Sequence, residues 1–229
     1  MKSLKQLLAV IGMFACAVSW AVDKDSLIVP GKAIGKISIG MEHAMVLRLL
    51  GAPHREDDLG YVADSDHPNA YPDIIRDDWI VPVPISKHPE GGEGVFFADF
   101  FSVYSRGRLV VQVEVRGVRY KTKDGLARAS TGAQWRKHFP DFETTFHHFR
   151  HPSEGGWPAA KHNVLYLDAT KAGIAWRFGA MGDLAPDPSP DGWVEAVAVH
   201  APGTPVIVDP DGGSRFIWKD APRRLSTEH

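Results

Sequence analysis

The chain has 229 residues with 26 basic and 28 acidic side chains, which gives a formal charge of −2 at pH 7. This balance, without any basic run, argues against nucleic acid and anionic lipid as main partners. Seven tryptophans and eleven phenylalanines indicate a folded chain. A chain of this length buries about 70% of its unfolded surface, which is enough for one domain or two small ones.

The N-terminus has the layout of a secretory signal peptide. Two lysines precede an apolar run at 7–18, and the small residues Ser19 and Ala21 stand at −3 and −1 of a cut after Ala21. The sequence therefore predicts a signal peptide at 1–21 and a periplasmic or secreted protein. A retained membrane anchor and a lipid anchor on Cys16 are the alternatives. The apolar run is shorter than the roughly 20 residues of a spanning helix, and the residues before Cys16 form a poor lipobox.

Removal of the signal peptide leaves 24 basic and 28 acidic residues and no cysteine. Disulfides therefore cannot stabilise the mature chain, even in an oxidising compartment. The hydrophobic core has to hold the fold together without them.

Residues 34–53 predict a short strand, a glycine turn at Gly40 and a helix at 42–50. Gly51 suits the left-handed position after a helix, and Pro53 prevents its continuation. The apolar residues of this helix follow the i, i+3, i+4 pattern of a stripe that packs on a core: Met45, Val46, Leu49 and Leu50.

A long insert at 55–94 follows this helix. It is rich in aspartate and proline and contains the aromatic residues Tyr61, Tyr71 and Trp79. Loops of this length are usually functional or disordered, and exposed aromatic residues in polar surroundings are typical of binding hot spots. We therefore expect these three residues to contact a partner. In one alternative, residues 79–85 pack as an extended strand on the sheet and the acids are solvated. In the other the acids bind Ca²⁺, although no Asp-x-Asp-x-Asp-Gly loop is present.

Residues 95–104 and 109–115 predict a β-hairpin. In its second strand, valines alternate with the polar residues Gln112 and Glu114. This alternation predicts a sheet with one buried face and one wet face.

A second, weaker copy of the 34–53 pattern starts near Gly125. A T-x-x-Q capping box at 131–134 predicts the start of a helix, which Pro140 ends as Pro53 ends the first. At an offset of 89 the apolar positions correspond in pairs: Ile37 with Leu126, Val46 with Trp135, and Leu50 with Phe139. Further strands are predicted at 163–167, 174–178 and 193–199, and the last matches 109–115 at an offset of 84.

These elements predict an α+β fold of two tandem units, each a short helix packed on an antiparallel β-sheet. The first unit is 22–119, with the insert at 55–94, and the second is 120–205. Residues 206–229 are expected to form a small hairpin, between 206–208 and 216–218, and a tail.

The second unit carries a histidine cluster after its helix. The candidates for partner contact there are His147, His148, His151 and Trp157. On a helix His147 and His151 share a face and could bind zinc, with His138, His162 or an aspartate as third ligand. The β-branched and aromatic neighbours favour a strand, on which His147, Phe149 and His151 share a face. Solvated histidines on a loop are the remaining interpretation.

The pattern I-x-x-G-x-x-x-x-x-V-x-x-x-L-G-x-P at 37–53, followed by a hairpin with Arg-Gly-Arg at its tip, resembles the helix-on-sheet units of the small lipoproteins of the outer-membrane barrel-assembly machine. Two such units in tandem resemble the secreted β-lactamase inhibitory proteins. The resemblance covers the first unit well and the second loosely, and it implies binding of another protein without catalysis. It carries no functional residue across, and this chain lacks disulfides and a good lipid-attachment cysteine.

Catalytic motifs are missing from the sequence: the mature chain has no cysteine, no G-x-S-x-G, no H-E-x-x-H and no G-x-G-x-x-G before a long helix. We therefore predict a non-enzymatic binding module, of inhibitor or assembly type, that needs no cofactor and binds another exported or envelope protein. The predicted contact surface is the pair of segments 61–79 and 147–157, at one end of the sheet. A histidine-rich metal-binding protein or metal-dependent hydrolase, and a structural cell-envelope protein, are the alternatives.

Overall fold

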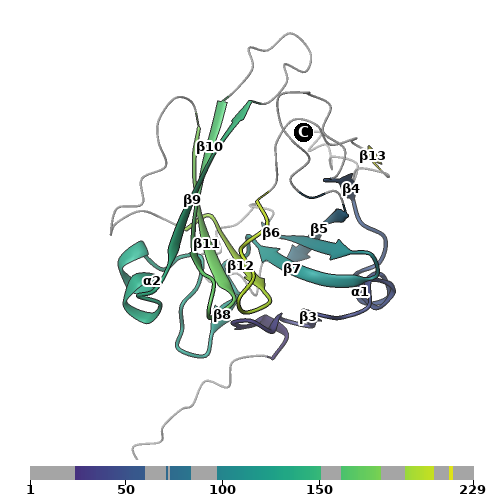
Figure 1. The fold of residues 1–229 in the computed structure, drawn as a ribbon. Helices are drawn as coiled ribbons and strands as arrows, with labels where there is room; N and C mark the ends of the chain where they lie inside the picture. The colour runs from purple at the N-terminus through teal and green to yellow at the C-terminus, as the bar shows by residue number, and fades with distance from the viewer. Residues whose placement is uncertain are drawn as a thin grey trace, which may run out of the picture.

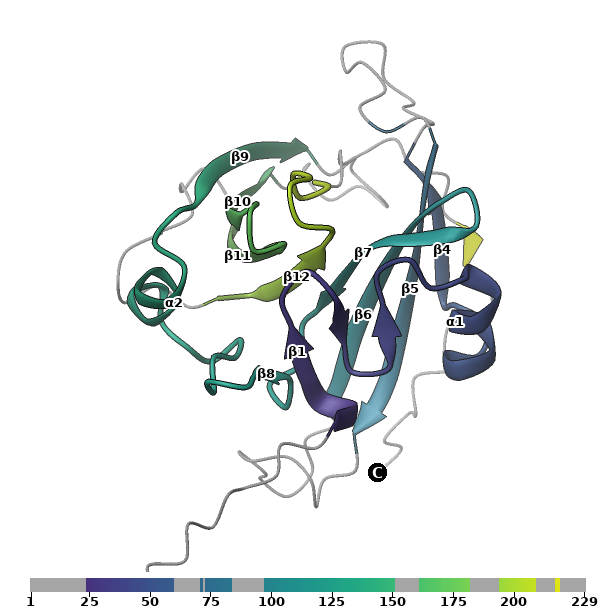
Figure 2. The same ribbon diagram turned by 60° about the horizontal axis from the view of Figure 1, so that its bottom comes forward.

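The computed structural model of the protein describes residues 24–59, 71, 73–83, 97–150, 161–181, 194–208 and 217–218. Within them the fold is α+β, with two α-helices, one 3₁₀ turn, η2 (Lys24–Ser26), and two β-sheets (Figure 1). Helix α1 spans His43–Leu50 and α2 spans Gly132–His138. The two helices lie at opposite ends of the molecule (Figures 1 and 2).

The larger sheet is antiparallel and has nine strands in the order β13-β4-β5-β6-β7-β12-β11-β10-β9. Strands β4 to β7 form one meander and β9 to β12 form another, and the pairing of β7 with β12 joins the two. We call this β7–β12 pairing the central seam. The strands are β4 (Arg55–Asp58), β5 (Ile74–Val83), β6 (Phe97–Arg106), β7 (Leu109–Val115), β9 (Glu143–Arg150), β10 (Lys161–Ala169), β11 (Ile174–Met181), β12 (Ala196–His200) and β13 (Ile217–Trp218).

The smaller sheet has four short strands in the order β3-β2-β1-β8. They are β1 (Leu27–Val29), β2 (Ala33–Ile34), β3 (Ile37–Ser38) and β8 (Lys121–Thr122). Strands β2 and β3 contact β7, and Figure 2 brings this sheet to the front between the two helices. Ile28, Ile34 and Ile37 bury their side chains in the main core, so the smaller sheet closes that core.

The main core lies on one face of the larger sheet, which we call the core face. Directly paired strand positions form a continuous apolar row on it: Trp79, Phe101, Val115, Val197, Trp176 and Leu167. All six belong to one buried cluster that draws on both meanders. The two halves of the sheet therefore share a single core.

Both helices pack on the core face at the positions that the repeat pattern indicated. Val46 of α1 and Trp135 of α2 are buried in the main core, and Leu50 and Phe139 pack against it. The Trp135 ring stacks on Trp176 of β11 with 5.4 Å between ring centroids. Packing on the core is what keeps such short helices folded, because an isolated helix of this length is unstable.

The predicted helix ends are confirmed. Thr131 and Gln134 form the reciprocal capping box at the start of α2. Gly51 has φ +80° after α1, a value that glycine adopts without strain. Its N–H donates to the Leu47 carbonyl oxygen.

The opposite face of the larger sheet, which we call the polar face, is not wet as the sequence predicted. Gln112 and Glu114 are both buried, with at most 1% of their surface exposed. Residues 206–208 lie over this face, where Gln112 binds the Ile207 backbone and Glu114 bonds to Tyr166 and Arg177. Alternation showed that the two faces differ in polarity, but it could not show that the polar side chains are paired and covered.

Two further expectations are wrong. The predicted insert at 55–94 contains all of β4 and β5, so much of it is sheet; the alternative of an extended strand is confirmed for residues 79–83. The predicted C-terminal hairpin does not form, because Ile217–Trp218 pairs with β4 and not with 206–208. The 95–115 hairpin and the strands expected near 163, 174 and 193 are confirmed within a few residues at their ends.

Candidate functional site

The structure contradicts the predicted partner contact of Trp79, because this residue is buried. Its side chain is only 1% exposed, in the main core, and its Nε1–H donates to the Gly51 carbonyl oxygen at 3.1 Å. Trp79 therefore holds the end of α1 on the sheet and cannot form a hot spot for a partner.

Tyr71 is half-buried and also serves the fold. Its ring packs against a small cluster on the polar face, which includes Ile74 and Tyr104. Its hydroxyl accepts a hydrogen bond from the Val208 N–H at 3.2 Å. Tyr71 and Trp79 thus lie on opposite faces of the sheet and do not form one surface.

Of the remaining predicted contacts, the structure describes only His147 and His148, both on β9. His147 and His148 lie on this strand, opposite Val164 and Asn163 of β10, which favours the strand interpretation over the helical zinc site. Tyr61, His151 and Trp157 lie outside the described residues. Within the described part of the chain no group of three or more histidine, cysteine, aspartate or glutamate residues is arranged to hold a metal ion.

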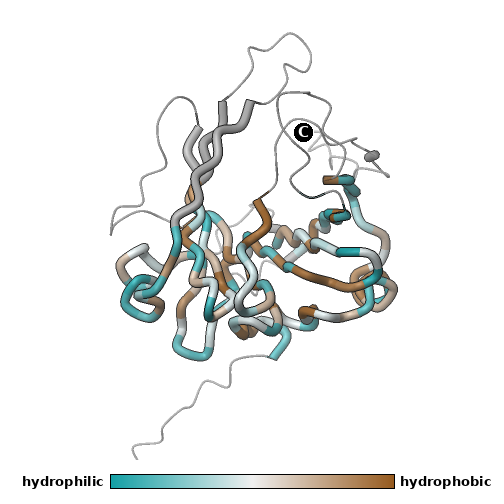
Figure 3. Tube along the Cα trace, in the orientation of Figure 1, coloured by the Kyte–Doolittle hydropathy of each residue, from teal (hydrophilic) through white to brown (hydrophobic). Residues whose placement is uncertain are grey.

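The sequence interpretation missed an exposed apolar surface on α1. Only Val46 of this helix is buried, whereas Met45, Leu47 and Leu49 are 39%, 36% and 44% exposed. Figure 3 shows the hydrophobic colour of α1 at the outer end of the molecule. A short helix that is apolar nearly all round is normally buried on more than one side, and that excess of apolar positions was the signal in the sequence.

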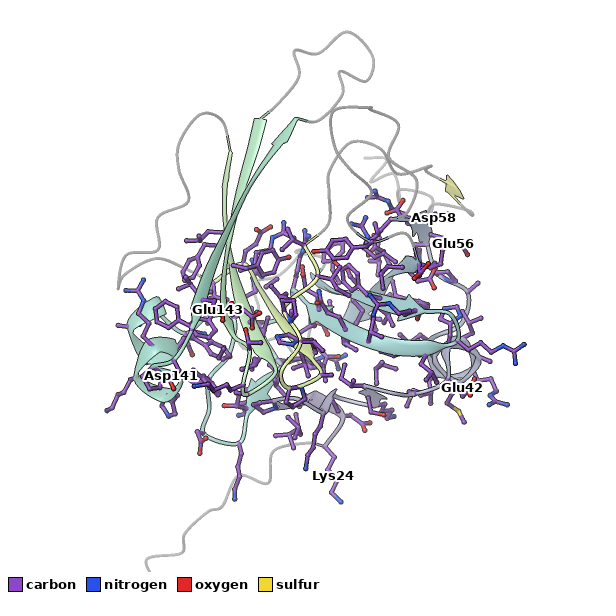
Figure 4. The ribbon with its side chains drawn as sticks, in the orientation of Figure 1. Lys24, Glu42, Glu56, Asp58, Asp141 and Glu143 are labelled. Carbon is purple, nitrogen blue, oxygen red and sulfur yellow. The ribbon has the colours of Figure 1, made fainter. Side chains whose placement is uncertain are left out.

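The turn between β6 and β7 adds Leu109 to this surface. Leu109 is 46% exposed and forms a β-bridge with Glu42, the residue before α1. The His43 N–H donates to the Arg108 carbonyl oxygen at 2.7 Å, and the Val110 N–H donates to the Met41 carbonyl oxygen at 2.9 Å. These bonds fix the turn to the start of α1, which Glu42 marks in Figure 4. Met45 and Leu49 lie one turn apart on one side of α1, whereas Leu47 lies on another side, because residues two apart in a helix do not share a face. We call the exposed surface of α1 with Met45, Leu47 and Leu49, together with Leu109, the α1 face.

The α1 face also carries arginines. Arg48 on the helix and Arg106 and Arg108 at the β6–β7 turn are all exposed. This surface therefore combines apolar side chains with positive charge, although the chain as a whole is slightly acidic.

Beneath α1, on the core face, a histidine and an aspartate form a close pair. The His43 Nε2 atom lies 2.5 Å from Oδ2 of Asp77, whose side chain is fully buried on β5. Burial raises the pKa of Asp77 to about 6, although the hydrogen bond and the charge of His43 act in the opposite direction. Glu56, which pairs with Asp77 across β4 and β5, and Asp78 add to the rise.

The polar face carries a row of ion pairs in two groups. In the first, Arg76 bonds to Asp57 at 2.5 Å and to Asp78 at 3.2 Å, and Arg55 bonds to Asp57 at 2.7 Å. In the second, Arg177 bonds to Glu114 and Glu195 at 3.2 Å each, and Arg116 lies within 3.7 Å of the same two carboxylates.

Glu114 is the centre of the second group. Burial alone would raise its pKa, but Arg177, Arg116 and the Tyr166 hydroxyl outweigh burial, so its pKa is lowered. Burial raises the pKa of Tyr104 and of Tyr166, so both phenols keep their protons. Four arginines thus face four carboxylates in the two groups. This balance is typical of a structural network and offers no net charge to a substrate.

None of the helices in the described part of the chain is long and apolar enough to cross a membrane. No protein-family model, no curated protein and no solved structure matches this chain.

Proposed function

We propose that the protein is an exported, non-enzymatic binding module that docks another exported or envelope protein on the α1 face. The observation that supports this most is the exposure of three large apolar side chains on a helix of eight residues, with a fourth, Leu109, fixed beside them. Clustered apolar side chains on a soluble surface typically mark an interaction site.

The second helix shows what a solvated helix looks like in this fold. Both helices bury one large residue in the same core, Val46 in α1 and Trp135 in α2. The exposed residues of α2 are small or polar: Ala133, Gln134, Lys137 and His138. The apolar exposure of α1 therefore goes beyond what packing on this sheet requires.

The charges around the α1 face indicate the chemistry of the partner. Arginine is enriched at protein interfaces because its planar guanidinium binds carboxylates with two hydrogen bonds. Because Arg48, Arg106 and Arg108 accompany the exposed apolar residues, the partner is expected to present both apolar side chains and carboxylates.

We also propose that the two halves of the larger sheet are tandem copies of one helix-on-sheet unit. Each half runs from a helix into a four-stranded antiparallel meander. The central seam pairs Glu114 with Ala198, and these residues correspond at the offset of 84 that matches the two strands in sequence. An approximate two-fold axis through the seam would place equivalent residues directly opposite each other, as in an isologous contact between two subunits.

A photo-cross-linker placed at position 47 tests the docking proposal, with position 134 on α2 as the matched control. In cells that express the protein, position 47 is expected to yield one stoichiometric protein adduct and position 134 none. Substitution of Met45→Asp together with Leu49→Asp should weaken capture of that protein at least ~10-fold, because two charges then enter a desolvated contact.

The same double variant should keep its fold, because exposed substitutions usually change the free energy of unfolding by about 0.5 kcal/mol or less. The matched variant on α2, Ala133→Asp with Lys137→Asp, should leave capture intact. Equal adducts at positions 47 and 134, or full capture by the folded Met45→Asp, Leu49→Asp variant, would rule out the α1 face.

A further inference from the structure

The polar face holds a segment of this chain in the way a binding site holds a peptide. Residues Val206, Ile207 and Val208 are 4%, 8% and 2% exposed, yet they belong to no strand. They lie on the face of the larger sheet and not along its edge, so no backbone ladder holds them.

Side chains from the sheet bind the backbone of this segment at three consecutive residues. The Val206 N–H donates to Oδ2 of Asp168 at 2.8 Å, the Ile207 N–H to Oε1 of Gln112 at 2.6 Å, and the Val208 N–H to the Tyr71 hydroxyl at 3.2 Å. The three acceptors come from β10, from β7 and from the residue that precedes β5 by a few positions.

Gln112 binds both backbone groups of a single residue, Ile207. Its Nε2 also donates to the Ile207 carbonyl oxygen, at 2.9 Å, so the side-chain amide replaces the neighbouring strand that would bind this residue in a sheet. Because these bonds go to the backbone, they do not depend on the sequence of the segment, as in recognition of extended peptides.

The side chains of the segment belong to two separate apolar clusters. Val206 and Val208 pack with Tyr166 and with the small side chains of Ala175 and Ala198. Ile207 belongs to the other cluster, with Leu59, Ile74 and Tyr104. Alternate residues thus pack in different clusters, which favours an extended conformation and β-branched side chains.

The binding groups are held in place by contacts of their own. Asp168 receives His200 Nε2 on its other oxygen at 3.0 Å, and His200 is buried. The Tyr166 hydroxyl donates to Glu114 at 2.8 Å. Gln112 lies on β7 in the centre of the sheet, so neither its position nor those of Asp168 and Tyr166 depend on the segment.

We propose that this trough, formed by Tyr71, Gln112, Tyr166, Asp168, Ala175 and Ala198, is a peptide-binding site for an extended, uncharged, β-branched segment, and that residues 206–208 fill it in cis. Only an exposed turn around Gly203, Thr204 and Pro205 joins the segment to β12. The segment can leave without breaking any strand ladder of the larger sheet. This site is separate from the α1 face, which lies across the sheet on the core side.

A cut in the linking turn tests the proposal on the full chain. A protease recognition sequence is inserted between Thr204 and Pro205. After cleavage, residues 206–208 are held only by the trough and by the two-residue pairing of β13 with β4 further along the same fragment. A fluorescent peptide with the sequence Pro-Val-Ile-Val-Asp is then titrated and followed by anisotropy. The cut protein is expected to bind it at least ~100-fold more tightly than the uncut protein, whose tethered segment competes at high effective concentration.

Two controls show whether the backbone is what is recognised. A peptide with proline in place of its isoleucine lacks the N–H that Gln112 binds and should bind the cut protein at least ~10-fold more weakly. Tyr71→Phe removes only the hydroxyl that Val208 uses and should weaken binding of the original peptide by about 3- to 10-fold.

Three results would overturn the site. If the cut protein unfolds, or never exchanges its own segment for the labelled peptide, then 206–208 is an integral part of the core. If the proline peptide binds as tightly as the original, the backbone is not what the trough recognises.

Discussion

At the scale of single residues, the His43–Asp77 pair is where the two halves of the molecule differ most. At the offset of 89, His43 corresponds to Gly132. Asp77 on β5 and Leu167 on β10 each lie two strands away from the central seam, in line with seam residues that correspond to each other in sequence. Asp77 and Leu167 therefore occupy equivalent positions in the two halves of the sheet. The first half thus has a buried ionisable pair under its helix where the second has glycine and leucine.

This pair should make the stability of the fold depend on pH. The folded-state pKa of Asp77, about 6, lies above its ordinary value of 3.8, so the folded state binds the proton more tightly than the unfolded state. The contribution of Asp77 to the free energy of unfolding is therefore greatest below about pH 4 and is lost as the pH rises to about 6, by up to about 1.4 kcal/mol per pH unit. In Asp77→Asn, which keeps an acceptor for His43, this dependence should be absent.

Urea unfolding of the wild type and of Asp77→Asn between pH 4 and pH 7 measures the effect. The difference between their free energies of unfolding should change with pH up to about 6 and then stay constant. Asp124→Asn, at an exposed turn position, serves as control and should run parallel to the wild type. A parallel curve for Asp77→Asn as well would show that Asp77 keeps an ordinary pKa in the folded protein.

At the scale of elements, local signals in the sequence were enough to place the helices and the main hairpin. Capping residues, Gly51 and the valine alternation act within a few residues of the chain, so they are visible without knowledge of the fold. Strand β5 was hidden because it contains Pro82 and the acidic residues Asp77 and Asp78, which are typical of loops. Those acids are tolerated in the sheet because they are paired: Asp77 with His43, which is distant in sequence, and Asp78 with Arg76 of the same strand.

The candidate site was predicted less well, for a related reason. Helix α1 has two adjacent apolar stripes, and periodicity alone does not tell which one faces the core. Met45 and Leu49 were assigned to the core, whereas the sheet accepts only Val46 and part of Leu50. Aromatic residues were assigned to the surface, yet Trp79 is buried, since a large apolar ring contributes more to the core than to a solvated loop.

The packing of α2 should be essential for stability. Trp135 is fully buried and stacks on Trp176 at 5.4 Å and on Phe139 at 6.1 Å. Trp135→Ala is therefore expected to lower the free energy of unfolding by about 3–5 kcal/mol, measured by urea titration. Lys137→Ala on the exposed side of the same helix should change it by about 0.5 kcal/mol or less. Similar small effects for both variants would mean that α2 does not dock on β11.

At the scale of the whole molecule, one core cluster extends through both meanders and the smaller sheet. The sequence indicated two units and left open how they meet. Their junction is the pairing of β7 with β12, and nothing local in either strand specifies that contact. Because no gap in the core separates the halves, the described chain is expected to unfold as one cooperative unit.

Native-state hydrogen exchange checks this expectation. Amides in β5, from the first meander, and in β11, from the second, should open with the same free energy and the same denaturant dependence. If β11 exchanged through a separate, lower-energy opening while β5 stayed protected, the halves would be independent domains.

The central seam is also expected to form later during folding than the hairpins on either side of it. The turns between β6 and β7 and between β10 and β11 join neighbours in sequence, whereas the paired residues Val113 and Val199 are 86 positions apart in the sequence. Pairings between distant residues form slowly, because a long loop must close before any contact offsets its entropy. Until the seam closes, β7 and β12 are two bare strand edges rich in valine and alanine. Such edges pair readily with other chains, so the refolding yield should fall as protein concentration rises, and a chain that has not yet closed the seam would be most prone to aggregation.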